Sequence, residues 1–299
     1  MRALLEAHWG LAGAEVVDHH GGMNSRTWFV TAGGERYVAK CAGGDWFPGG
    51  IAVADALARR GFASGAPVRT TDGRLTVDVR TTDGRLTVDV APRDRLALHA
   101  PGDRLALHAP GDRLALLAFV DGAAAEDPGQ IGVKLAEVHR LLRGVTVEGE
   151  VAMDWVDPDA AHLGLRPWLR EAVAGAVHAL HAQGPLTEGL LHADPAPEAF
   201  VGRGLIDWGV ALRGPLLYDV ASALMYLGGA GGTFLDAYRR AGVVPDDELR
   251  DALPVLLRFR HAVQADYFAR RIAGDDLTGI ADPAENEKGL EDARRALRA

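Results

Sequence analysis

The chain has 299 residues, of which 48% are hydrophobic and 24% charged, so it is long enough for one large domain or two lobes of ordinary globular composition. Its net charge is −9 and its basic residues form no stripe, which argues against a nucleic-acid partner. Cys41 is the only cysteine, so an internal disulfide is excluded, and neither a signal peptide nor an apolar run of roughly 18 residues is found. These features predict a cytoplasmic protein without a membrane partner.

The first forty residues predict a small antiparallel sheet. Runs of apolar and β-branched residues occur at 15–17, 27–30 and 36–40. Gly21–Ser25 and Gly33–Gly34 separate these runs, and both segments are typical of turns. Lys40 ends the third run and is one of only three lysines in a chain that otherwise uses arginine.

A helix is expected next, over residues 50–60, and tandem repeats follow it. RTTDGRLTVDV occupies 69–79 and again 80–90, and DRLALHAPG occupies 94–102 and again 103–111. Each copy alternates apolar residues as a strand does, and Asp-Gly and Pro-Gly supply turns. Two copies are too few for a solenoid, so we interpret the 29 extra residues as a slippage duplication or an error in the gene sequence. A functional strand-rich insertion is the alternative, and because the copies are identical the sequence does not decide which one enters the sheet.

The rest of the chain predicts one more strand and then helices. The strand covers residues 114–120. Helices are expected at 131–142, 166–183, 216–227, 233–240 and 246–272, with Pro254 marking a start or a kink, and at the end of the acidic tail 275–299. His139, His178 and His181 lie on these helices without a ligand cluster beside them, so we assign them to packing or to the surface.

Residues 189–224 carry the residues that suggest chemistry. His192-Ala193-Asp194 forms a short loop, and an apolar strand predicted at 204–206 leads to Asp207 and Trp208. Asp219 opens an apolar helical run, where it is expected to act as a helix cap rather than a catalyst. Two carboxylates thirteen residues apart suit phosphoryl transfer, in which one orients and deprotonates a hydroxyl while the other holds magnesium against the nucleotide. Walker, GxGxxG and GxSxG motifs are all absent from the sequence.

This ordered set resembles the aminoglycoside phosphotransferase family, relatives of the choline and homoserine kinases. The family pattern is His-Gly-Asp, four residues and Asn, then Ile-Asp-Trp or Ile-Asp-Phe, then Tyr-Asp-Leu-Ala. The same places here hold His192-Ala193-Asp194, Ile206-Asp207-Trp208 and Tyr218-Asp219-Val220-Ala221. The chain departs from the pattern twice, because Ala193 replaces the Gly and Ala199 replaces the metal-binding Asn.

The resemblance implies an α+β fold of the protein-kinase type, with a β-rich N-terminal lobe at 1–118 and a helical C-terminal lobe at 119–299. Asp194 would be the base, His192 would brace its loop, and Asp207 would hold Mg²⁺. The nucleotide would be bound by Lys40, by Gly21, Gly22, Asn24 and Ser25 of the first turn, and by the backbone of Phe119 and Val120 at the hinge. Glu198 is a candidate second metal ligand, since it supplies the oxygen that Ala199 lacks.

The predicted activity is ATP- and Mg²⁺-dependent transfer of the γ-phosphate to a hydroxyl of a small molecule, either aminoglycoside-like or a metabolite. The glutamate that such kinases place on the helix after the strand lysine is missing, and Asp45 or Asp55 could substitute for it. The missing glutamate and Ala199 favour an alternative, a degenerate kinase that binds nucleotide or metabolite without transfer. The sequence predicts neither the acceptor nor the oligomeric state.

Overall fold

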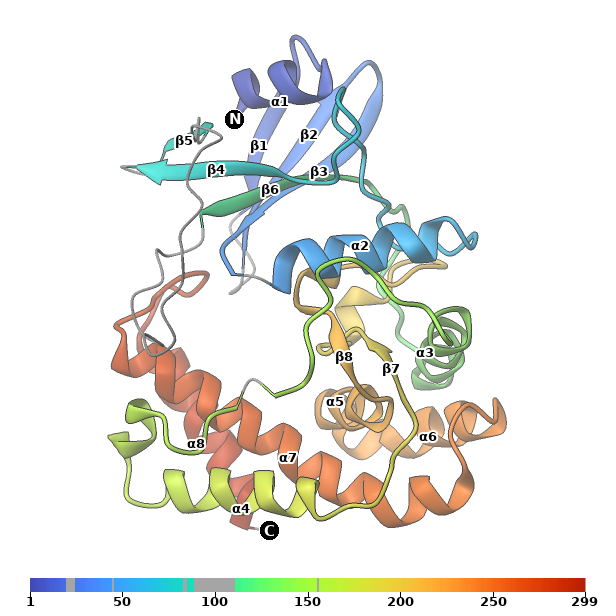
Figure 1. Cartoon of the computed structure of the whole chain (residues 1–299), viewed down its shortest axis with the longest axis vertical. Coiled ribbons are helices and arrows are strands. Elements are labelled where there is room, and N and C mark those ends of the chain that lie inside the picture. Colours follow the sequence, from blue (N-terminus) through green and yellow to red (C-terminus); the bar gives the residue numbers. More distant parts are fainter. Residues whose placement is uncertain (20–24, 45, 83–84, 89–110, 155, 299) are drawn as a thin grey trace, which may run out of the picture.

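A computed structural model of the chain describes residues 1–19, 25–44, 46–82, 85–88, 111–154 and 156–298. A sheet lies at the N-terminal end of the molecule and a group of helices at the other end (Figure 1). This arrangement confirms the predicted α+β architecture. Within the described ranges, every helix is too short or too polar to cross a lipid bilayer.

The N-terminal part holds two helices and a six-stranded sheet of described residues with strand order β1-β2-β3-β6-β4-β5. All pairings within this sheet are antiparallel. The elements are α1 (Arg2–Trp9), β1 (Glu15–His19), β2 (Arg26–Ala32), β3 (Glu35–Ala42), α2 (Trp46–Ala58), β4 (Val77–Thr82), β5 (Arg85–Val88) and β6 (Asp112–Ala118).

The turn between β2 and β3 shows how the sequence sets the sheet. Ala32 pairs with Glu35, so the loop between them is the dipeptide Gly33-Gly34. Both glycines have positive φ, at 60° and 85°, the conformation that two-residue hairpin turns of type I′ require. The predicted tight turn is therefore confirmed.

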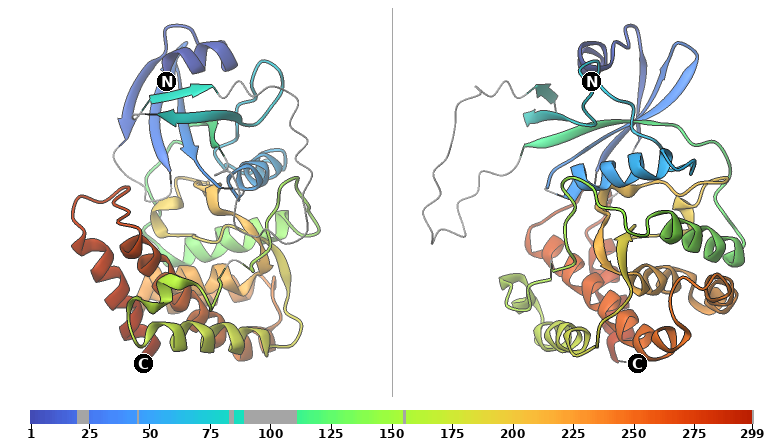
Figure 2. Two further views of the ribbon diagram at one scale, coloured as in Figure 1. Left: turned by 60° about the vertical axis from the view of Figure 1, so that its left-hand side comes forward. Right: turned by 45° about the vertical axis from the view of Figure 1, so that its right-hand side comes forward.

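Helix α2 lies between the sheet and the C-terminal helices in every view (Figures 1 and 2). On one side, Phe47 and Ile51 pack under the sheet against Ala115 and Leu117. On the other side, residues 53–57 of the helix join the main hydrophobic core of the C-terminal part. The helix begins at Trp46, four residues before the predicted start.

The C-terminal part is built around α5 and α7, with a small β7–β8 ladder beside the catalytic loop. Its elements are α3 (Pro128–Leu141), η1 (Ala161–Leu165), α4 (Leu169–His181), β7 (Glu188–Leu191), η2 (Pro197–Ala199), η3 (Trp208–Val210), β8 (Leu212–Pro215), α5 (Leu217–Leu227), η4 (Gly228–Ala230), α6 (Gly231–Arg240), α7 (Asp246–Ala273) and α8 (Ala284–Arg298), where η denotes a 3₁₀ turn.

One local prediction is wrong. Residues 204–206 form no strand, because their backbone bonds to loops instead: Leu205 N–H donates to Ala63 O at 3.1 Å and Ile206 N–H to Ala199 O at 2.9 Å. Helix α7 begins at Asp246, as predicted, so Pro254 lies inside it and does not mark its start. The register that the sequence left open is also seen, since β4 runs across the junction between the two RTTDGRLTVDV repeats. The segment 89–110, with nearly all of both DRLALHAPG copies, lies outside the described residues.

Candidate active site

The predicted catalytic loop follows β7, and a buried carboxylate holds its backbone. Asp219 is fully buried, and its two oxygens accept hydrogen bonds from the backbone N–H groups of His192 at 2.8 Å and Ala193 at 2.7 Å. Ala193 has φ of 70°, in the left-handed region that favours glycine and costs other residues roughly 1–2 kcal/mol. The strained loop is therefore stabilised by Asp219, which acts as an anchor rather than as the predicted helix cap.

His139 supports the same anchor from α3. Its Nε2 lies 3.1 Å from Asp219 Oδ2, and its Nδ1 lies 2.8 Å from the hydroxyl of Tyr238. The His139 side chain is only 2% exposed, so its predicted packing role is confirmed, and it also has polar partners that the sequence did not reveal.

His192 connects the catalytic loop to the second acidic segment. The backbone N–H of Asp194 can only donate, so at 3.3 Å it makes His192 Nδ1 the acceptor. The other ring nitrogen, Nε2, then carries the proton and donates to Ile206 O at 2.8 Å. The ring also packs edge-on against Trp208, with ring centroids 4.7 Å apart. His192 thus occupies the bracing position that the resemblance predicts.

Asp207 and Lys40 meet between the two parts of the molecule. Lys40 Nζ lies 2.5 Å from Asp207 Oδ1, and the Asp207 side chain is 58% exposed. Enclosure of the site raises the pKa of the Asp207 carboxyl, but the charge and hydrogen bond of Lys40 outweigh this effect and hold that pKa below its ordinary value. Asp207 therefore stays ionised at neutral pH, with Oδ2 free of partners among the described residues.

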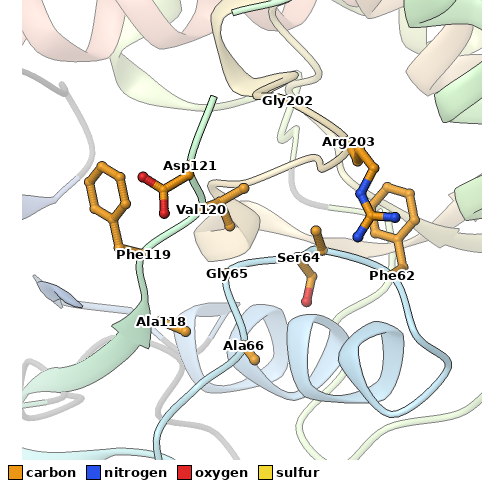
Figure 3. A pocket seen from close by; sticks show the side chains of 11 residues that line it. Phe62, Ser64, Gly65, Ala66, Ala118, Phe119, Val120, Asp121, Gly202 and Arg203 are labelled. Atoms are coloured by element: carbon orange, nitrogen blue, oxygen red, sulfur yellow. The ribbon is translucent and has the colours of Figure 1, made fainter. Parts of the chain in front are cut away.

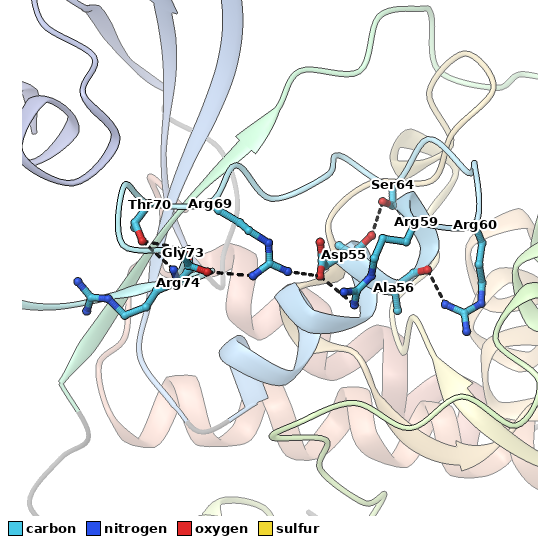
Figure 4. Close-up of polar contacts among 10 residues, drawn as sticks. Asp55, Ala56, Arg59, Arg60, Ser64, Arg69, Thr70, Gly73 and Arg74 are labelled. Atoms are coloured by element: carbon cyan, nitrogen blue, oxygen red, sulfur yellow. Dashed lines mark hydrogen bonds and ion pairs between the residues drawn. The ribbon is translucent and has the colours of Figure 1, made fainter.

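Asp55, one of the two proposed substitutes for the missing helix glutamate, pairs with arginines rather than with Lys40. Its carboxylate lies 2.9 Å from Arg59 and 2.8 Å from Arg69 (Figure 4). Asp45 lies outside the described residues. In place of a glutamate, the first turns of α2 carry Gly49 and Gly50, whose missing side chains let the helix pack onto the backbone of Gly149 and Trp208.

The face of the sheet that carries Lys40 forms an apolar roof. Cross-strand partners in an antiparallel sheet share a face, so the register places Val17, Phe29 and Val38 together. Val38 lies two residues before Lys40 on β3, so all three residues share the face of Lys40. Val17 is 53% exposed and Phe29 is 40% exposed, which is unusual for large apolar side chains. The sequence analysis missed this roof because the three residues lie on three different strands.

The hinge follows β6. Phe119 N–H donates to Arg36 O at 3.3 Å, so the Phe119 carbonyl and Val120 remain the hinge groups open to a base. The guanidinium of Arg36 lies 4.0 Å from the centre of the Phe119 ring and also pairs with Asp121, which ties β3 to the hinge. Of the predicted phosphate-binding turn, Ser25 lies directly before β2, while Gly21, Gly22 and Asn24 lie outside the described residues.

A pocket lies beside the hinge. It has a volume of about 400 Å³ and is bounded by the loop 62–66, the hinge 118–121 and the turn at Gly202 and Arg203 (Figure 3). It shares Phe119 and Val120 with the predicted nucleotide site, but none of the three charged residues Lys40, Asp194 and Asp207 lines it.

Two residues that the sequence analysis did not assign contact the predicted base. Tyr226 of α5 donates its hydroxyl to Asp194 Oδ1 at 2.6 Å, and Arg260 of α7 donates Nη2 to the same oxygen at 2.9 Å. The sequence could have singled out Arg260, because helical spacing places it on the same face as the apolar residues Leu253, Leu256 and Val263. A charge on a buried helix face needs a partner, and the partner here is the base.

The fold, with the catalytic-type loop at Asp194 and the Lys40–Asp207 pair, is that of a kinase-like phosphotransferase. The family model of the APH phosphotransferase enzyme family matches the chain over residues 15–253. The chain therefore belongs to this family, and the predicted family and enzyme class, a phosphotransferase, are confirmed. Comparison with the curated proteins gives no match.

Solved structures support the fold. A microcompartment-associated aminopropanol kinase is 17% identical with a TM-score of 0.69, covering 99% of this chain and 94% of that chain. An amicoumacin kinase solved with AMP-PNP, Ca²⁺ and Ami is 14% identical with a TM-score of 0.67, covering 94% and 87%. A choline/ethanolamine kinase family protein from Mesorhizobium loti is 17% identical with a TM-score of 0.62, covering 100% and 94%. The predicted kinase-like fold is thus confirmed.

Proposed function

We propose that this protein is an ATP- and Mg²⁺-dependent kinase that transfers the γ-phosphate to a hydroxyl of a small molecule in the cytoplasm. The observation that carries the proposal is the connection between two acidic segments and the strand lysine. Asp194 and Asp207 are linked through His192, and Asp207 contacts the strand lysine Lys40. Family membership supports the reaction type, and the neighbouring kinases solved with AMP-PNP or ADP support a nucleoside triphosphate as donor.

The nucleotide would lie under the apolar roof. Val17, Phe29 and Val38 offer a flat apolar surface for the base, and the Phe119 carbonyl with Val120 offers hydrogen-bonding groups at its edge. Lys40 lies on the same sheet face, so its ammonium would reach the phosphates. Exposure of Val17 and Phe29 fits this role, because a bound base would cover both side chains.

The residues present fit a magnesium ion. Asp207 supplies an exposed carboxylate with one oxygen not bonded to Lys40. Magnesium is usually held by one or two carboxylates together with phosphate oxygens and water, so a cluster of three protein ligands, which the described residues lack, is not required. When bound, the ion would neutralise charge on the phosphates, and Glu198 remains a candidate for a second contact.

In the transfer step Asp194 orients the acceptor hydroxyl and takes its proton. The hydroxyl oxygen forms a bond to the γ-phosphorus as the bond from that phosphorus to the β-phosphate oxygen breaks, and ADP leaves. The acceptor is a small molecule with a free hydroxyl. The neighbours named for aminopropanol, choline/ethanolamine, spectinomycin and hygromycin B suggest amino alcohols and aminoglycosides as the first acceptors to test.

The second candidate function is binding without transfer, which Ala199 favours because its methyl side chain offers no oxygen to a metal. The deciding experiment measures ADP formation from Mg-ATP with a panel of amino alcohols, aminoglycosides and sugars. A kinase gives acceptor-dependent ADP and a phosphorylated acceptor by mass spectrometry. Binding of Mg-ATP with no acceptor raising ADP formation above the background would favour the degenerate protein.

A further inference from the structure

The carboxylate of Asp194 is held by side chains that its own loop does not supply. Oδ1 accepts the Tyr226 hydroxyl at 2.6 Å and Arg260 Nη2 at 2.9 Å, and these residues lie 32 and 66 positions further along the chain. Within the loop, the side chain five residues after Asp194 is the methyl group of Ala199, which is buried and offers no hydrogen bond. The orientation of Asp194 therefore depends on α5 and α7.

The side chain of Arg260 is held in place by burial and by a second hydrogen bond. It is 7% exposed, and its Nε donates to the buried Ser222 Oγ at 2.9 Å, so one guanidinium group bridges α5 and the catalytic loop. Burial opposes the positive charge, but Tyr218, Asp194 and Tyr226 raise the pKa of Arg260 above its ordinary value. Burial and the neighbouring Asp194 likewise raise the pKa of Tyr226, so its hydroxyl keeps the proton that it donates.

We propose that Arg260 and Tyr226 form a clamp that positions the carboxylate of Asp194 for phosphoryl transfer. The clamp engages Oδ1 and leaves Oδ2, which has no partner among the described residues, for the acceptor hydroxyl. This inference rests on the proposed function, since it names positioning residues for the same base. Because phosphoryl transfer depends on positioning more than on a strong base, two donors on Oδ1 are compatible with catalysis.

A purely structural role does not account for the contacts. Replacing a buried ion pair by well-packed apolar residues is often neutral or stabilising, so a buried arginine on an apolar helix face is not needed for stability alone. An acceptor-binding role for Tyr226, a residue that is 42% exposed, makes a different kinetic prediction. Loss of an acceptor contact raises KM for the acceptor, whereas loss of base positioning lowers kcat.

The test compares Tyr226→Phe, Arg260→Gln and Arg260→Lys with Arg258→Gln, an exposed residue of the same helix that donates to Leu297 O. Steady-state kinetics use Mg-ATP and the acceptor of the panel that gives the highest turnover. Tyr226→Phe removes only the hydroxyl and should lower kcat about tenfold, and Arg260→Gln about 100-fold, as for hydrogen bonds to charged groups. Arg260→Lys keeps the charge but loses the planar fork, so its kcat should fall between Arg260→Gln and wild type.

In these variants Kd for Mg-ATP should stay within about twofold of wild type, and Arg258→Gln should be kinetically silent. An unchanged kcat in Tyr226→Phe and Arg260→Gln, or a loss confined to the acceptor KM, would overturn the clamp.

A second measurement does not depend on turnover. If Arg260 and Asp194 are paired, the Tm loss of the Arg260→Gln, Asp194→Asn double variant should be clearly smaller than the sum of the two single losses. Additive losses would overturn the pairing. If the variants show this coupling but the wild-type protein phosphorylates no acceptor, the pairing stands. The proposed function is then contradicted, and the positioning role with it.

Discussion

At the scale of residues, the site depends on a few contacts whose loss has separable effects. Lys40 and Asp207 form one contact, which we propose faces the nucleotide, and Asp194 with its partners forms another, which we propose faces the acceptor. His192 links the two, because its Nδ1 accepts a hydrogen bond from Asp194 N–H and its Nε2 donates one to Ile206 O. Substitution of Lys40 should therefore change nucleotide affinity, whereas substitution of Asp194 should change turnover.

Replacing Lys40 by alanine should weaken binding of the triphosphate much more than binding of adenosine. In the proposed function the Lys40 ammonium, which pairs with Asp207, would contact the phosphates and not the base or the sugar. Isothermal titration with ATP and with adenosine measures both losses. An equal loss for the two ligands would mean that Lys40 does not touch phosphate.

Replacing Glu198 by alanine should raise the magnesium concentration needed for half-maximal turnover at least about tenfold. Glu198 is exposed on the η2 turn, and the adjacent Ala199 is hydrogen-bonded through its carbonyl to Ile206, next to Asp207. Glu198→Gln keeps an oxygen donor and should recover part of the affinity. A magnesium titration unchanged in the alanine variant would assign Glu198 to the surface.

At the scale of elements, α2 is the part that connects the nucleotide lysine to the acidic segments. Its glycines let it pack onto the Trp208–Gly209 backbone, directly after Asp207. The helix that usually carries a glutamate therefore acts here through backbone contact rather than through a charge.

Gly50→Ala should destabilise the protein and weaken Mg-ATP binding together. The added methyl group would overlap the carbonyl oxygen of Trp208, a backbone atom that cannot move aside without shifting the Asp207 segment. Gly175→Ala is the matched control, because Gly175 is an exposed position of helix α4 with nothing near the added methyl group, and this variant should gain up to about 1 kcal/mol of stability. Thermal unfolding and ATP titration of both variants measure the effects. Equal stability of the two variants would contradict close packing at Gly50.

The sequence predicted the elements better than the contacts between them. Alternating patterns and the Gly33-Gly34 dipeptide were enough for the first hairpin, because strand periodicity and turn chemistry are local properties. The trio of acidic motifs was enough for the family. The clamp on Asp194 was not predictable, since Tyr226 and Arg260 reach it only through the packing of α5 against α7. Residues 204–206 have a strand-like composition, but Leu205 bonds to the α2–β4 loop at Ala63 and Ile206 bonds to Ala199 of η2.

At the scale of the whole molecule, the described part of the RTTDGRLTVDV repeats lies at one edge of the sheet. Among the described residues, β4 pairs with β6 through residues 77–79, which precede the second copy, and β5 pairs with β4. The pairing that joins this region to the rest of the sheet therefore needs one copy of RTTDGRLTVDV.

Deleting residues 80–90 and 94–111 should leave a folded protein of 270 of the 299 residues that still binds nucleotide. Val79 and Asp112 are directly paired in the sheet, and the deletion joins them by Ala91-Pro92-Arg93, a loop length that suits a hairpin. Circular dichroism and Mg-ATP titration test the variant. An insoluble product, or one that no longer binds nucleotide, would show that the repeats are structural.

The central claim, that Asp194 acts as the base of a phosphotransferase, is tested most directly by Asp194→Asn with Mg-ATP and the best acceptor. Side-by-side measurements of turnover and of Mg-ATP affinity are needed, because the base acts in transfer and not in nucleotide binding. The account predicts that turnover falls at least about 100-fold while the Kd for Mg-ATP changes by no more than about threefold. Turnover within about tenfold of wild type would contradict it.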